Sequence, residues 1–81
     1  MRPGIDEEFV KRFGRIVREA RQDLGFSLRQ LANEIGCRYQ TISGLESGES
    51  GAYAKTTLRL MVYLGIDPQD IVGEPDEWGD L

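Results

Sequence analysis

The residues of this 81-residue chain that could do chemistry are suited to binding rather than to reaction. The chain has no histidine and a single cysteine, Cys37, and no glycine-rich phosphate loop is present in its sequence. A nucleophile paired with a base, or a Cys/His metal site, therefore has no candidate residues. We expect no enzymatic activity, no metal ion and no other cofactor. Cys37 is expected to be a packed thiol without a redox role.

A run of polar side chains offers a different chemistry, the recognition of hydrogen-bonding surfaces. A Gln side chain can bond bidentately to the edge of adenine, and Ser and Thr hydroxyls can donate to or accept from bases and phosphates. On a helix these side chains would share a face. The run consists of Tyr39, Gln40, Thr41, Ser43 and Gly44, with Arg38 at its start. An ordinary solvated helix face is the alternative interpretation.

The segment that must position this run begins with the pattern of a short helix. Ser27 and Gln30 have the spacing of a capping box, in which each residue bonds the backbone of the other. Apolar residues then recur at helical spacing as far as Ile35. Gly36 can adopt the left-handed conformation that ends a helix.

A second helix is expected directly after this glycine turn, with Ile42 and Leu45 facing inward and Gly48 ending it. The turn fixes the angle between the two helices, so the second helix projects from the domain. A projecting helix with a polar free face fits the major groove of duplex DNA.

Several residue pairs also match the pattern of a known family. They are Arg18 and Arg21, Leu31 and Ala32, Ile42 and Ser43, Glu46 and Gly48, and the run Leu64, Gly65 and Ile66. With these marks, the chain from Gly14 to Gly73 resembles the Cro and phage-repressor type of helix-turn-helix domain, often called Xre-like. The resemblance implies an all-α, compact five-helix fold of the lambda-repressor kind. It also implies an ion pair between Arg21 and Glu46.

The resemblance implies one DNA-binding domain over residues 1–73, with the helix-turn-helix proper at about 27–47, followed by an acidic tail at 74–81. The expected function is sequence-specific binding of double-stranded DNA by a transcriptional regulator, a Cro-like or repressor-like homodimer on a palindromic operator. The residues expected to contact DNA are Ser27, Arg29, Arg38, Tyr39, Gln40, Thr41, Ser43, Gly44, Ser50 and Lys55.

Two positions depart from the family pattern. Leu28 stands where many relatives have a phosphate-binding Gln, so Ser27 and Arg29 are expected to supply that anchor. Gly44 stands where many relatives have a long base-reading side chain. The base contacts are therefore expected mainly from Gln40 and Thr41.

The net charge of −4 is unevenly distributed. Nine Lys and Arg against five Asp and Glu give +4 between Phe9 and Met61, whereas six acidic residues and no basic one give −6 between Val62 and Leu81. The remaining residues, near the N-terminus, contribute −2. A mildly basic body is consistent with binding to phosphates.

The first helix is expected to be capped by Asp6 and to bury one apolar arc. That arc consists of Phe9, Phe13, Ile16, Val17, Ala20 and Leu24. The opposite side carries Lys11, Arg15, Arg18 and Gln22. This basic stripe is expected to be a solvated face, with the alternative that its N-terminal end touches phosphates.

A fourth helix at about Lys55–Leu64 has more apolar residues than one narrow stripe needs, which suggests a second buried surface. A short fifth helix should follow, with Asp67 as its cap and Pro68 at its first position. In related repressors this end of the domain forms a two-fold dimer. The alternative is that the surface only completes the core of a monomer.

A protein-interaction module on the same scaffold, such as an antitoxin or anti-repressor, is the other hypothesis. It would bind a protein through the acidic C-terminal surface, with Trp78 as a candidate anchor. The tail itself is expected to serve only solubility, with partner binding through Trp78 as the alternative. The longest apolar run, Leu60 to Leu64, is far too short for a membrane span, so a cytoplasmic location with no membrane partner is expected.

Overall fold

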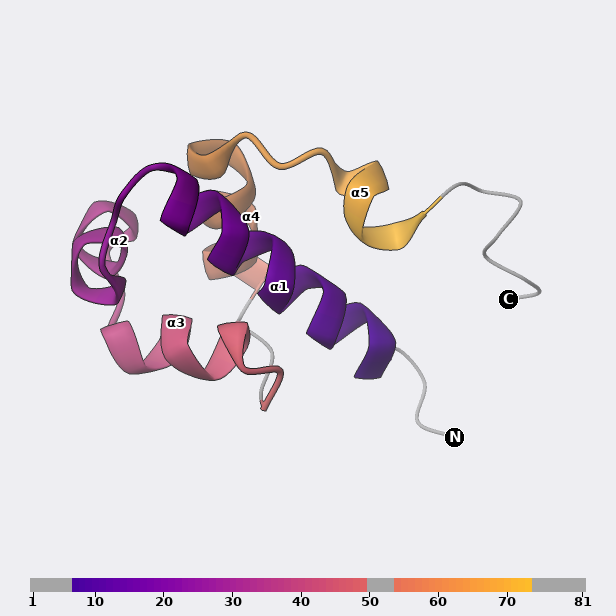
Figure 1. Cartoon of the computed structure of the whole chain (residues 1–81), viewed down its shortest axis with the longest axis horizontal. Coiled ribbons are helices and arrows are strands. Elements are labelled where there is room, and N and C mark those ends of the chain that lie inside the picture. Colours follow the sequence, from indigo (N-terminus) through magenta and orange to yellow (C-terminus); the bar gives the residue numbers. More distant parts are fainter. Residues whose placement is uncertain (1–6, 50–53, 74–81) are drawn as a thin grey trace.

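The computed structural model describes residues 7–49 and 54–73, and these residues form five α-helices with no strand among them (Figure 1). The helices are α1 (Glu7–Asp23), α2 (Leu28–Ile35), α3 (Tyr39–Glu46), α4 (Ala54–Leu64) and α5 (Pro68–Val72). The predicted all-α, five-helix fold is confirmed. The predictions made for Asp6, Ser50 and the tail at 74–81 fall outside the described residues.

The long helix α1 crosses the middle of the molecule, and three other helices pack on it (Figure 1). α3 lies along one side of α1, and α4 and α5 contact α1 on other sides. α2 lies at the C-terminal end of α1 and contacts both α3 and α4. Arg12 in α1 donates a 3.0 Å hydrogen bond to the carbonyl of Ile71 in α5, which ties the last helix to the first.

The ends of α2 follow from its sequence as predicted. The Ser27 hydroxyl oxygen accepts from the backbone N–H of Gln30 at 3.1 Å, and the Ser27 N–H donates to the Gln30 side-chain oxygen at 2.7 Å. This reciprocal pair satisfies two backbone donors that the first turn of a helix leaves without partners. Gly36 ends the helix with φ at 85°, a conformation that strains any residue with a Cβ atom.

The core combines side chains from all five helices. Its fully covered members are Val17, Leu31, Ile42, Leu45 and Leu60, and Phe13, Ala32, Ile35 and Ile71 complete it. Burying one such aliphatic or aromatic side chain contributes about 1.5–3 kcal/mol. The apolar faces predicted for residues 28–35 and for the following helix therefore form one shared core.

The prediction for the apolar arc of α1 is wrong at both of its ends. Phe9 is 38% exposed and Leu24 is 53% exposed. Leu24 follows the last residue of α1, Asp23, and sits in the turn that leads to α2. Phe9 lies in the first turn, where its ring stacks on Phe13 with 6.3 Å between centroids rather than entering the core.

In the two described segments, no helix combines the length and apolar character needed to cross a membrane.

Candidate nucleic-acid interface

α3 is anchored by two buried residues and presents its other side to solvent. Ile42 is 0% exposed and Leu45 is 1% exposed, so this side of the helix is sealed against the core. The helix begins at Tyr39, after Arg38 in extended conformation, and Gly48 follows its end with a left-handed φ of 77°. The predicted second helix and its glycine stop are both present.

The outward side of α3 is a stripe of small polar residues with one long member, Gln40. Gln40, Ser43 and Ser47 are exposed, and Gly44 between them is partly covered by its neighbours. These positions follow one another at offsets of three and four, the spacing of one helix face. We call this set the α3 stripe.

Ser47 was not among the residues predicted to contact DNA, because it is the cap that follows the last helical residue. Its position seven residues after Gln40, which places it on the same helix face, could have indicated it. In the structure its hydroxyl donates a 3.0 Å hydrogen bond to the carbonyl of Gly44, which holds its oxygen on the exposed side.

Tyr39 and Thr41 flank the stripe and are half-buried. The Tyr39 ring packs against the core, and the Arg29 guanidinium of α2 lies over it at 4.2 Å from the ring centroid. This cation–π contact holds an exposed positive charge at the edge of α3. Because Tyr39 and Thr41 are half-buried, Gln40 and Ser43 are the exposed side chains within α3 that can hydrogen-bond a base edge.

The other predicted contact residues lie around α3 with differing accessibility. Arg38 and Lys55 are exposed, at the start of α3 and in the first turn of α4. Ser27 is exposed as well, but the capping box already uses its backbone N–H. Its hydroxyl proton remains available to donate to a phosphate, in addition to the bond that the oxygen accepts.

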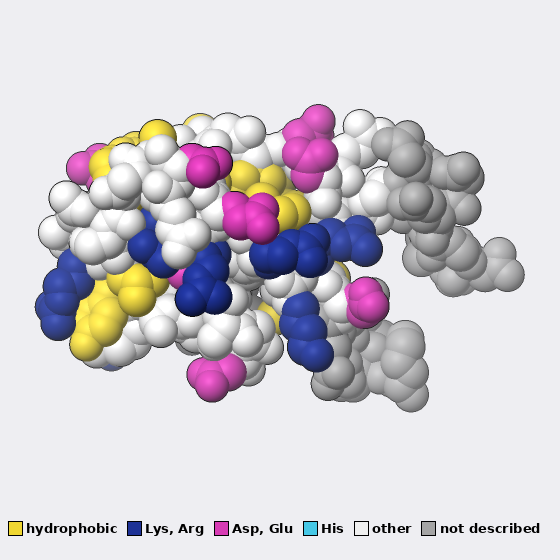
Figure 2. All heavy atoms as spheres, viewed as in Figure 1, with side chains coloured by type: hydrophobic (Ala, Val, Ile, Leu, Met, Phe, Trp, Pro, Cys, Tyr) yellow, Lys and Arg dark blue, Asp and Glu magenta, His cyan; other side chains and the backbone are white. Residues whose placement is uncertain are grey.

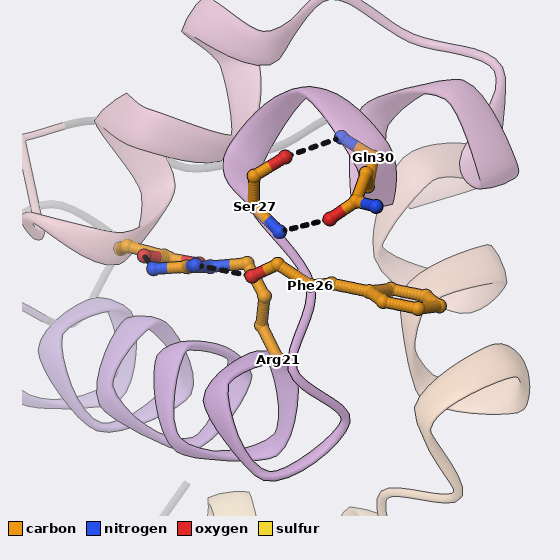
Figure 3. A network of polar contacts seen from close by, with 5 residues as sticks. Arg21, Phe26, Ser27 and Gln30 are labelled. Atoms are coloured by element: carbon orange, nitrogen blue, oxygen red, sulfur yellow. Dashed lines mark hydrogen bonds and ion pairs between the residues drawn. The ribbon is translucent and has the colours of Figure 1, made fainter.

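A partly buried ion pair fixes α3 relative to α1, and its partners are those that the family resemblance implied. Arg21 Nε donates to Glu46 Oε2 at 2.7 Å, and Arg21 Nη2 donates to Glu46 Oε1 at 3.0 Å. Arg21 Nη1 donates to the carbonyl of Phe26 at 2.7 Å, just before the capping box of α2 (Figure 3). One guanidinium thus joins α1, the entry to α2 and the end of α3.

The Arg21–Glu46 pair is largely withdrawn from water, with side-chain exposures of 12% and 7%. The hydrogen bond with Glu46 raises the pKa of Arg21, burial opposes this rise, and the carboxylate charge supports it. A bidentate pair of this kind restricts both distance and direction. α3 is therefore held in one orientation by more than hydrophobic packing.

α1 and α3 approach each other closely at Gly14. A Cβ atom at this position would collide with the carbonyl oxygen of Leu45 and lie 3.1 Å from that of Glu46. Only a glycine allows the two backbones to come so near. This requirement could not be predicted from local sequence, because Gly14 is in a helix interior and the constraint comes from a distant segment.

The outer side of α4 is the second notable surface. Leu60 points inward and is fully covered, whereas Leu58 is 62% exposed, Val62 84% and Tyr63 41%. We call Leu58, Val62 and Tyr63 the α4 face. The surplus of apolar residues predicted for this helix thus forms an exposed patch within the single chain. The patch borders a shallow hollow against the end of α2 at Ile35 and Gly36.

Two neighbours stabilise the border of this hollow. Arg59 donates a 3.3 Å hydrogen bond to the carbonyl of Ile35, and the Phe26 ring stacks on Tyr63 with 6.4 Å between centroids.

Cys37, just beyond α2, is half-buried and packs against the core. Its burial raises the pKa of the thiol, and the positive charge of Arg59 partly offsets this effect.

Two short helices joined by a tight glycine turn, with the second helix exposing a polar stripe, define a helix-turn-helix domain. The comparison with family models agrees: the helix-turn-helix domain model matches residues 14–77. The chain belongs to this family. Comparisons with curated proteins and with solved structures gave no match.

Proposed function

We propose that this protein is a sequence-specific regulator of transcription that binds double-stranded DNA by placing α3 in the major groove. The proposal rests on the exposed α3 stripe. The opposite side of the same helix is buried in the core and held by the Arg21–Glu46 ion pair. A rigidly held polar helix can enter the groove without ordering itself first, which avoids an entropic cost on binding.

Gln40 is the residue we propose as the main base reader, because its amide can pair bidentately with adenine. Ser43 and Gly44 have little or no side chain and so allow the helix to approach the bases closely. Thr41 and Tyr39 at the flanks would reach a thymine methyl or a phosphate at the groove edge. These roles follow from residue type and accessibility along α3.

The DNA backbone would be held by residues on either side of α3. Ser27 and Arg29 lie at the start of α2, Arg38 at the start of α3 and Lys55 at the start of α4. Ser50, outside the described residues, is proposed for the same role from sequence alone. Charge-assisted contacts to phosphate carry little sequence information but set affinity and register.

We further propose that the protein acts as a homodimer and that the α4 face is part of the interface. Exposed apolar side chains at Leu58 and Val62 are one helical turn apart and form a continuous strip. Two copies joined in this way would present two α3 helices to a palindromic operator with half-sites about 34 Å apart.

Selection of bound duplexes from a random DNA pool at near-physiological salt tests the proposal. A palindromic consensus is expected, and Gln40→Ala should lower affinity for it by about 1–3 kcal/mol and relax the preference at one base position. Absence of any enriched sequence, with the protein folded, would refute autonomous sequence-specific binding.

The α4 face also supports a second candidate function, a module that binds another protein. Val62→Glu separates the two candidates, because it adds a charge to the patch without touching α3. Loss of the dimer in analytical ultracentrifugation, with weaker operator binding, supports the regulator. A monomeric wild-type protein that binds no DNA supports the protein-binding module instead.

A further inference from the structure

We propose that Lys11 and Arg18 of α1 form an additional phosphate-binding row beside the recognition helix. The inference rests on the proposed DNA-binding function and adds a ligand site to it. The ligand is the sugar–phosphate backbone along one edge of the major groove. We call Lys11 and Arg18 the α1 row.

The position of this row follows from the close approach at Gly14. Lys11 is three residues before Gly14 and Arg18 four residues after it, so the three share one side of α1. Gly14 is the point where the backbones of α1 and α3 meet, and Arg21, three residues beyond Arg18, reaches Glu46. The basic residues thus lie on the same side of α1 as its contact with α3.

A second contact fixes the end of the row. A Cβ atom built on Gly48 would lie 3.1 Å from Cγ of Lys11 and 3.7 Å from its Cα. The Lys11 side chain therefore runs beside the glycine that follows α3. Its ammonium group is at the surface, since Lys11 is exposed.

The α1 row carries two exposed positive charges, and Glu46 of α3 is already paired with Arg21. Two exposed carboxylates lie near the Lys11 end of the row: Glu8 is three residues before Lys11, and Glu49 follows Gly48 in the chain. The positive charge of the row is therefore strongest towards Arg18. Figure 2 shows Lys and Arg side chains gathered in a band across the visible face, with Asp and Glu side chains next to the band at several points. Glu19 follows Arg18, about 100° further round the helix.

Two phosphate strands border the major groove, so a helix lying in the groove has phosphates on either side. The α1 row would meet one of these strands, together with Arg29 held over Tyr39. Each cation that neutralises a phosphate releases condensed counterions, so log K falls more steeply with log salt, by about 0.9 per contact.

The test measures fluorescence anisotropy of the selected duplex and of an unrelated duplex between 50 and 200 mM salt, for wild type, Lys11→Gln and Arg18→Gln. Each variant should reduce the salt slope by about 1 and weaken both duplexes equally, which leaves the preference ratio unchanged. Lys11→Arg and Arg18→Lys keep the charge and should keep the slope.

Arg15→Gln is the positional control, because Arg15 is about 100° round α1 from Gly14 and has Glu19 four residues on. A slope loss from Arg15→Gln as large as that from Arg18→Gln would indicate a general effect of net charge and overturn the assignment. An unchanged slope in Lys11→Gln and Arg18→Gln, with wild-type preference intact and unaltered thermal melts, overturns this inference alone. A wild-type protein that shows no sequence preference refutes the regulator proposal instead.

Discussion

The contact between α1 and α3 and the outer side of α4 both involve helices with apolar residues at helical spacing. The first region is buried, whereas the second is exposed. Between α1 and α3, Gly14 allows the two backbones to touch, and Val17 and Leu45 are buried. The Arg21–Glu46 ion pair links the same two helices. On α4, Leu58 and Val62 remain exposed although Leu60 beside them is covered.

The difference separates a surface that is covered within one chain from a surface that stays exposed. Exposed apolar side chains are common singly, but adjacent ones on one helix mark an interaction site. The α1–α3 contact determines how the α3 stripe is presented, whereas the α4 face is the surface we propose for assembly. Mutations in the two regions should therefore affect different measurements.

Arg21→Ala should give the largest effect, because it leaves the Glu46 carboxylate buried without its partner. We expect a loss of about 3–5 kcal/mol in the free energy of unfolding, measured by urea denaturation. Arg15→Ala, at an exposed position on the same helix, is the matched control and should change stability by less than about 0.5 kcal/mol. Equal effects of the two changes would mean that the ion pair does not hold α3.

Leu60→Ala and Val62→Ala should have opposite effects on folding and on dimerisation, although both residues are in α4. Leu60 is fully covered, so its truncation should cost about 2–5 kcal/mol of unfolding free energy. Val62 is 84% exposed, so its truncation should cost a monomer less than about 0.5 kcal/mol. Sedimentation should report the reverse order, with dimerisation weakened by Val62→Ala. A dimer insensitive to this change would exclude the α4 face from the interface.

Gly14→Ala should reverse the usual effect of this substitution. In an open helix interior, Ala is more stabilising than Gly by roughly 0.5–1 kcal/mol. Here the new methyl would collide with the carbonyl oxygen of Leu45, and we expect destabilisation of about 1–3 kcal/mol. Thermal melts measure it, and a stabilised variant would disprove the close approach of α1 and α3.

Cys37 should give the smallest effect, visible mainly at high pH. Burial raises the pKa of its thiol above the ordinary value of 9.0, so the folded protein keeps this proton to higher pH than the unfolded chain. The contribution of the protonated thiol to the free energy of unfolding is fully present below about pH 9. It is lost as the pH rises through the pKa that the thiol has in the folded protein. Reaction with a thiol reagent at pH 8 should therefore be slower in the folded protein than in urea. Equal rates would contradict a packed thiol.

Local signals in the sequence predicted much of the fold. The capping box at Ser27 and Gln30, the left-handed Gly36 and the cap at Asp67 all depend on residues within a few positions of one another. The Arg21–Glu46 pair could be predicted only from the family resemblance, since no local pattern links residues 25 positions apart.

Other features depend on where neighbouring helices end, which periodicity does not reveal. Phe9 and Leu24 continue the apolar pattern of α1 but extend beyond the segments that could cover them. The need for Gly14 arises from α3, and the exposed position of Ser47 arises from the way that helix is capped. For the site, residue types predicted Gln40, Ser43 and Gly44 of the α3 stripe but not Ser47, and the half-buried state of Tyr39 and Thr41 follows only from the packed core.

Backbone amide NMR shifts recorded during titration with the selected duplex test the division between the two regions most directly. We expect large shifts at Gln40, Ser43 and Gly44, smaller shifts along the α1 row, and shifts on the α4 face only where dimerisation changes. Shifts confined to Leu58, Val62 and Tyr63, with the α3 stripe unaffected, would refute binding through α3 and identify α4 as the binding surface.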